Sequence, residues 1–183
     1  NLKTVVMPDS VVEIGMYAFS GCENLCEVAF SSNLQKIGLS AFEGCSLESI
    51  VYPSSIQQVD SYAFSGNEIK SVTFLPGITA IPREACSFHY YNATLEEVVI
   101  PEGVKIIEGY AFYDLHISSL TLPVSLETVK EFAFDSVTID EINYNGSVSQ
   151  YSNNVEVENY EFSNNTFRYG PIKCNDGIFE EVF

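Results

Sequence analysis

The chain has 183 residues, 46% of them hydrophobic, which is enough for one domain with a buried core. Its 8 Lys and Arg residues stand against 25 Asp and Glu residues, and the net charge of −17 argues against binding to nucleic acid or an anionic membrane, because both require basic patches. No apolar run is long enough for a transmembrane helix, and no signal peptide is visible. The acidity leaves two interpretations open, which are solubility of an elongated molecule and an acidic binding face.

A nine-residue string recurs along the chain. Residues 14–22 read Ile-Gly-Met-Tyr-Ala-Phe-Ser-Gly-Cys, and residues 37–45 read Ile-Gly-Leu-Ser-Ala-Phe-Glu-Gly-Cys. The alanine of the string stands at Ala18, Ala41, Ala63, Ala85, Ala111 and Ala133, with Cys86 replacing the following Phe in the fourth copy. These alanines are 23, 22, 22, 26 and 22 residues apart. A period of this size predicts a solenoid, in which each repeat forms one turn.

Each repeat opens with apolar residues in an L-x-x-L-x-L pattern. The openings are Leu2, Leu25, Leu47, Ile69, Leu95, Ile117 and, for a partial seventh copy, Ile139. The last two apolar residues of each pattern are two apart, as Val5 and Met7 are, so they point to one face of a strand. Their β-branched and aromatic character also favours a strand.

The second half of each repeat predicts a strand end, a bend and a core contact. A proline often follows the strand, as at Pro8 and Pro53, and removes a donor from the ladder. A second apolar pair comes next, such as Val11 and Ile14, and the Ala-Phe element follows. The Phe is expected to fill the interior of the turn while the small Ala lets neighbouring backbones approach. One repeat buries little by itself, so neighbours must cover both of its faces.

These motifs resemble the BspA-like, Treponema-type leucine-rich repeats. The family pattern L-x-x-V-x-x-P-x-x-V-x-x-I-G-x-x-A-F-x-G-C is matched best by residues 2–22, and residues 25–45 match nearly as well but lack the proline. The resemblance covers about residues 1–151. It implies an α/β-class, mainly β leucine-rich repeat, a right-handed solenoid of about seven turns of 22–26 residues with a parallel sheet on its concave side. It also implies a modular surface or secreted protein that mediates adhesion or protein binding, without catalysis in the repeats.

Residues 152–183 are predicted to form a C-terminal β cap of the same domain. No Ala-Phe element is seen after the seventh opening, and residues 152–165 are polar. Thr166–Tyr169, Pro171–Cys174 and Ile178-Phe179 read as short strands, and residues 175–177 (Asn-Asp-Gly) signal a turn. A hairpin here is expected to cover the core and the open edge of the last turn.

The fourth repeat is longer than the others and suggests one binding site. It runs for 26 residues, from Ile69 to Thr94, and carries Ser-Phe-His-Tyr-Tyr-Asn at residues 87–92. Phe88, His89, Tyr90 and Tyr91 are candidate binding residues, because inserted loops with exposed aromatic side chains often form contacts. The alternative is that these aromatic side chains pack down on the solenoid.

Three columns of side chains are expected to project from the predicted sheet. The Ser/Glu column contains Thr4, Glu27, Ser49, Ser71, Glu97, Ser119 and Glu141. The valine column contains Val6, Ala29, Val51, Thr73, Val99, Thr121 and Asn143, and an edge column contains Lys3, Cys26, Glu48, Lys70, Glu96, Ser118 and Asp140. Glu27, Ser49, Ser71, Glu97 and Ser119 are the candidate binding residues, since a concave sheet is the usual binding surface of such solenoids. No Trp or Arg anchors these columns, so a simply solvated sheet is an equal alternative.

No catalytic, metal or cofactor motif is found. His89 and His116 fit no metal-ligand spacing and are expected in loops. The five cysteines contain no CxxC pair; Cys22 and Cys45 share one repeat position and are expected to be small buried side chains, with a disulfide between them as an open alternative. The absence of a G-x-S-x-G motif argues against a hydrolase, and neither an enzyme nor a bound cofactor is expected.

The sequence therefore predicts a non-catalytic binding or adhesion module of a cell-surface or secreted protein. The expected partner is a protein of the host matrix or a cell surface, or a polysaccharide, and the module is expected to be a monomer that does not insert into membranes. A structural spacer and an ancillary targeting domain of a secreted enzyme are the alternatives. Asn1-Leu2 enters a repeat midway, so we expect the chain to begin inside a longer parent protein.

Overall fold

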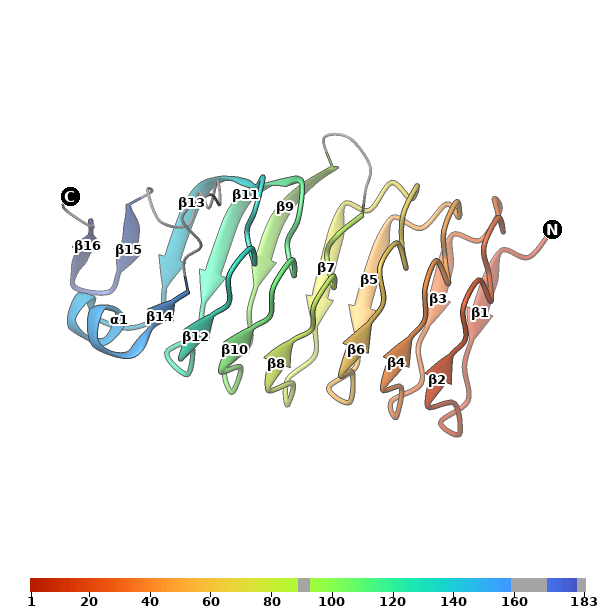
Figure 1. Ribbon diagram of the computed structural model, residues 1–183, viewed down its shortest axis with the longest axis horizontal. Coiled ribbons are helices and arrows are strands. Elements are labelled where there is room, and N and C mark those ends of the chain that lie inside the picture. Colours follow the sequence, from red (N-terminus) through yellow and green to blue (C-terminus); the bar gives the residue numbers. More distant parts are fainter. Residues whose placement is uncertain (89–92, 159–170, 181–183) are drawn as a thin grey trace.

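The computed structural model describes residues 1–88, 93–158 and 171–180. Successive turns stack along one axis, and the first turn and residues 171–180 lie at opposite ends of the stack (Figure 1). Each turn contributes one longer strand and one two-residue strand, and the strands of each kind line up in a row. This architecture confirms the mainly β solenoid that the repeat period predicts.

The longer strands form the row that lies behind the other in Figure 1. They are β1 (Thr4–Val6), β3 (Glu27–Ala29), β5 (Ser49–Tyr52), β7 (Ser71–Phe74), β9 (Ala93–Val99), β11 (Leu115–Leu122) and β13 (Thr138–Tyr144). All pair in parallel, β1 with β3, β5 with β7, and β11 with both β9 and β13. Each one lies at a predicted L-x-x-L-x-L opening. Its alternate apolar side chains point into the solenoid, as the period of two in that pattern predicts.

The second row consists of short parallel strands formed by the second apolar pair of each repeat. They are β2 (Glu13–Ile14), β4 (Lys36–Ile37), β6 (Gln58–Val59), β8 (Ala80–Ile81), β10 (Ile106–Ile107), β12 (Thr128–Val129) and β14 (Glu156–Val157). Three residues after the last residue of each of the first six, the chain bends through a left-handed conformation. The bend residues are Tyr17, Ser40, Tyr62, Glu84, Tyr110 and Phe132, with φ between 51° and 62°.

The Ala-Phe elements form the centre of the core, as predicted. Phe42 and Phe64 stack with ring centroids 5.4 Å apart and planes 4° from parallel, and Phe112 and Phe134 stack at 5.0 Å. The backbone N–H of Phe42 donates to the carbonyl oxygen of Ala63 at 2.8 Å. Because Ala63 is buried at this contact, a larger side chain would push the two turns apart.

The row of stacked phenylalanines is interrupted in the fourth turn. Cys86 occupies the Phe position there and is fully buried, and Phe88 is also buried, with 1% of its surface exposed. The Tyr52 hydroxyl donates to the carbonyl oxygen of Ala85 at 2.6 Å in the same region. Phe88 thus adds to the core the aromatic volume that Cys86 lacks. Its prediction as an exposed contact residue is wrong, and for this side chain the packed alternative holds.

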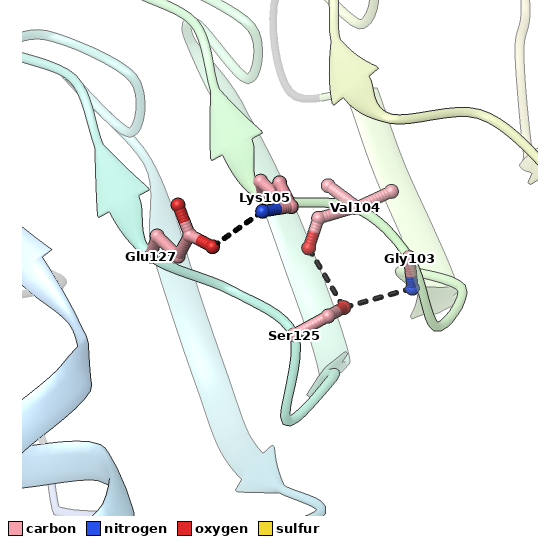
Figure 2. Close-up of polar contacts among 5 residues, drawn as sticks. All are labelled: Gly103, Val104, Lys105, Ser125 and Glu127. Atoms are coloured by element: carbon pink, nitrogen blue, oxygen red, sulfur yellow. Dashed lines mark hydrogen bonds and ion pairs between the residues drawn. The ribbon is translucent and has the colours of Figure 1, made fainter.

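Polar side chains connect neighbouring turns at the surface (Figure 2). The Ser125 hydroxyl donates to the carbonyl oxygen of Val104 and accepts from the backbone N–H of Gly103, both at 2.8 Å. Lys105 Nζ lies 2.7 Å from Glu127 Oε1. Hydroxyl contacts of this kind satisfy backbone groups in the bends, whereas an exposed ion pair contributes little net stability.

The C-terminal cap contains a helix that the sequence analysis does not predict. Helix α1 (Val148–Asn154) is capped by Ser147, whose hydroxyl accepts from the N–H of Gln150 while the Gln150 side chain accepts from the N–H of Ser147. The side chain of Tyr151 packs against Tyr144 of β13, with ring centroids 5.2 Å apart. The helix therefore closes one side of the core at the last turn.

The predicted C-terminal hairpin is confirmed. Strand β15 (Ile172–Cys174) pairs in parallel with β13 and antiparallel with β16 (Gly177–Phe179). The ring of Phe179 lies 5.0 Å from that of Tyr151 on α1, so helix and hairpin cover the last turn together. The strand predicted at Thr166–Tyr169 lies outside the described residues.

Candidate functional site

Strand pairing supports the predicted Ser/Glu column within three groups of neighbouring turns. Parallel pairing places Thr4 opposite Glu27. Ser49 lies opposite Ser71, and Ser119 lies between Glu97 and Glu141. Glu27, Ser49, Ser71 and Glu97 are exposed, and Ser119 is half-buried. The register thus brings side chains from separate repeats into line along the outer face of the longer strands.

The valine column runs beside it on the same face. Val6 pairs with Ala29, Val51 with Thr73, and Val99 with Thr121. The valines are strongly exposed for apolar residues, at 81% for Val6, 46% for Val51 and 48% for Val99. Since neither column contains an aromatic side chain, the face combines small apolar groups with hydroxyls and carboxylates.

Ion pairs neutralise part of the acidity of this face. Lys173 of β15 lies 3.0 Å from Glu141, and this hydrogen bond, aided by one from Asn143, lowers the pKa of the Glu141 carboxyl. Lys70 pairs with Glu48 in the edge column at 3.1 Å. Within the described part of the chain, neither Glu27 nor Glu97 takes part in an ion pair. These two carboxylates therefore carry the net negative charge of the Ser/Glu column.

The long fourth repeat extends a strand. Ala93 and Thr94 pair with Leu115 and His116, which lengthens β9 and β11 beyond the strands of the first turns. His116 was expected in a loop but lies in β11, where its Nε2 is 2.9 Å from Asp140 Oδ1. The candidate binding residues His89, Tyr90 and Tyr91 lie outside the described residues, so their role stays a prediction.

All five cysteines are free thiols, so the alternative of a disulfide between Cys22 and Cys45 is not what the structure shows. Cys45 is buried and donates to the carbonyl oxygen of Phe19 at 3.3 Å. Burial, aided by the neighbouring Cys22, raises the pKa of the Cys45 thiol to about 11. Burial also raises the pKa of Cys86. Cys26 is exposed, as its place in the edge column predicts.

We expect alkylation of the native protein to distinguish these thiols. At pH 8 only about one Cys45 in a thousand is a thiolate, so iodoacetamide should label Cys26 first and label Cys45 and Cys86 far more slowly until the protein is unfolded in urea. Raising the pH should speed the labelling of Cys45 about tenfold per unit, up to a pH near its pKa. Peptide mass spectrometry measures the order, and equal labelling of Cys26 and Cys45 at pH 8 would contradict the burial of Cys45.

The structure shows aromatic residues at four of the bends, which the sequence analysis does not predict as a group. Tyr17, Tyr62, Tyr110 and Phe132 each directly precede the alanine of a repeat. The rings of Tyr110 and Phe132 stack with centroids 5.2 Å apart and planes 12° from parallel, and the Arg83 guanidinium lies 4.5 Å from the centre of the Tyr110 ring. An aromatic residue precedes Ala in four of the six repeats, and this recurrence could have indicated the column. It did not indicate a bend, because aromatic residues rarely adopt a positive φ.

The described residues provide no arrangement typical of metal chemistry or of a membrane span. Across residues 1–88, 93–158 and 171–180, no three His, Cys, Asp or Glu side chains are placed to hold a metal ion. No helix in the same part of the chain is long and apolar enough to cross a bilayer.

Comparison with known proteins identifies relatives of the fold. A family model described as a BspA type leucine rich repeat region matches residues 1–89 and 84–182 in six copies. A Treponema pallidum leucine-rich repeat protein is 24% identical with a TM-score of 0.56, over 78% of this chain and 73% of that one. A Bacteroides ovatus leucine-rich repeat protein is 16% identical with a TM-score of 0.49, over 94% of this chain and 56% of that one.

The pneumococcal vaccine antigen PcpA is 24% identical with a TM-score of 0.46, over 78% of this chain and 41% of that one. A search of the curated proteins finds no match. The family match spans most of the chain, and the stacked parallel turns with Ala-Phe elements at their centre agree with it. This chain therefore belongs to the BspA-type leucine-rich repeat family.

Proposed function

We propose that this chain is a non-catalytic protein-binding module of a cell-surface or secreted protein. The observation that carries the proposal is the outer face of the longer strands, where the Ser/Glu and valine columns align side chains of successive repeats that are exposed in the first five and half-buried in the last two. Membership of a family whose other members are mostly surface or secreted proteins supports the location. In solenoids, an extended face built from successive repeats is the usual binding surface.

The chemistry of the two columns favours a protein partner with a basic patch. Exposed valines such as Val51 and Val99 offer apolar contacts to β-branched or aliphatic side chains. Glu27 and Glu97, together with the net charge of −17, attract a positively charged partner and speed its encounter. Because the two columns contain no aromatic ring on which a sugar could stack, this face fits a protein better than a polysaccharide.

Charge reversal at Glu27 and Glu97 is expected to slow binding. A Glu27→Lys/Glu97→Lys variant should associate about tenfold more slowly, at low salt, with a basic partner found on an array of matrix and surface proteins. Surface plasmon resonance at low and high salt measures the association rates. The control is Glu23→Lys/Glu68→Lys, which makes the same change in net charge at exposed positions outside both columns.

Two results would count against the proposal. If both double variants slow binding equally, net charge rather than this face governs association. If the array gives no saturable partner, the chain is better described as a structural spacer.

A further inference from the structure

A notch lies at Gly109, two residues after the short strand β10 ends. The residues at this position of successive repeats are Met16, Leu39, Ser61, Arg83, Gly109 and Glu131. Gly109 interrupts this row of side chains, and its backbone lines a pocket of about 370 Å³. A Cβ atom on Gly109 would lie 2.9 Å from the carbonyl oxygen of Glu131 and 3.6 Å from Arg83 Nη1. A side chain at Gly109 would therefore displace the backbone of the next turn beside the pocket.

One wall of the pocket is a stack that extends over three turns. The Arg83 guanidinium covers one face of Tyr110, and Phe132 covers the other. Arg83 Nε also lies 3.9 Å from Glu84 Oε1, within the range of a weak ion pair. A planar guanidinium fixed on an aromatic ring presents its N–H donors in a defined direction.

Carboxylates and a lysine complete the lining. Lys130 pairs with Glu158, and this hydrogen bond raises the pKa of the lysine. Glu131 is exposed on the side of Gly109 opposite Arg83. Since adjacent turns are one strand spacing apart, the backbones that carry Arg83 and Glu131 lie about 10 Å apart. The pocket therefore has donors from Arg83 and Lys130 and acceptors from Glu131 and the other two carboxylates.

The mixed charge of the lining selects the chemistry of a ligand. Two cationic and three anionic side chains surround the pocket, so a charged ligand of either sign would meet like charges. A hydroxyl group can donate to a carboxylate and accept from a guanidinium or ammonium group, so a ligand rich in hydroxyl groups can satisfy both kinds of side chain in this lining. The volume lies in the range of small-molecule sites, about 300–1,000 Å³.

We infer that the Gly109 notch binds a neutral hexose oligosaccharide, with sugar hydroxyls bridging Arg83 and Glu131 across the two intervening strand spacings. The site lies at the ends of the short strands and uses none of the residues of the proposed protein-binding face. It is therefore independent of that proposal, and Glu27→Lys/Glu97→Lys should leave sugar binding unchanged.

The test measures binding of neutral trisaccharides to the full chain. Maltotriose, cellotriose and mannotriose serve as probes in saturation-transfer NMR and calorimetry, with 3′-sialyllactose and trilysine as anionic and cationic probes. At least one neutral trisaccharide should bind, and Glu131→Ala should raise its Kd about tenfold through the loss of a charged acceptor. Glu127→Ala, which removes an exposed carboxylate of the same turn outside the pocket, should leave the Kd unchanged.

A second variant alters the wall of the pocket at Gly109. Gly109→Ala should abolish binding of the same trisaccharide, and circular dichroism shows whether the variant is folded. If it fails to fold, Glu131→Ala still decides the question, because its side chain is exposed. Absence of any neutral binder, tighter binding of a charged probe, or wild-type affinity in Glu131→Ala would each overturn the inference.

Discussion

Phe64→Ala is expected to lower the free energy of unfolding by about 3–5 kcal/mol. Phe64 is 1% exposed and stacks on Phe42. The edges of Phe30 and Tyr52 also contact it, with ring centroids 6.4 and 6.1 Å away. Removal of its ring leaves a cavity between aromatic neighbours that cannot collapse without moving two turns.

Urea unfolding followed by circular dichroism measures this effect. Val51→Ala is the matched control, since it shortens an exposed side chain and should change the free energy of unfolding by less than about 0.5 kcal/mol. In a solenoid, the free energy of unfolding is close to the sum of the stabilities of the single repeats and of the interfaces between them. The loss of stability should therefore come mainly from the interfaces of the third turn with its neighbours. An unfolding midpoint as close to wild type as that of Val51→Ala would contradict the central position of the Ala-Phe ring.

The repeat made most of the fold predictable from the sequence. An apolar position that recurs at a fixed period must face the neighbouring turns, because only there can each copy be covered. The columns of outward side chains follow from the same period, and the observed pairing of Thr4 with Glu27 or Ser49 with Ser71 bears this out. Periodicity therefore predicted strands, register and core together.

The predictions failed where the repeat pattern is interrupted and where a feature is built from the side chains of three turns. The direction of Phe88 depends on the space left by Cys86, which the position of Phe88 in a long repeat does not reveal. Helix α1 follows the last complete repeat, although Ser147 and Gln150 have the spacing of a capping box. The Gly109 notch needs side chains from adjacent turns, and only their packing shows that a pocket results.

Asn67→Ala is expected to cost about 3 kcal/mol, although it removes a polar side chain from a repeat position that holds Cys22 and Cys45 elsewhere. Asn67 is fully buried. Its Nδ2 donates to the carbonyl oxygens of Phe42 and Phe64, at 2.7 and 3.0 Å, and its Oδ1 accepts from the N–H of Leu47 at 2.9 Å. Alanine leaves these buried backbone groups unsatisfied, and each such group costs about 1–3 kcal/mol.

Asn67→Asp separates the donor function of this side chain from its size. The aspartate keeps the acceptor for Leu47 but places a carboxylate against the carbonyl oxygens of Phe42 and Phe64. Only its protonated form can donate to one of them, so its stability relative to wild type should fall as the pH rises through the pKa of the new carboxyl. Urea unfolding of both proteins at acidic and neutral pH measures this difference, with Asn24→Asp as an exposed control. A loss that is equal at both pH values would show that the two Nδ2 hydrogen bonds do not stabilise the turn, and that Asn67 acts only by filling space.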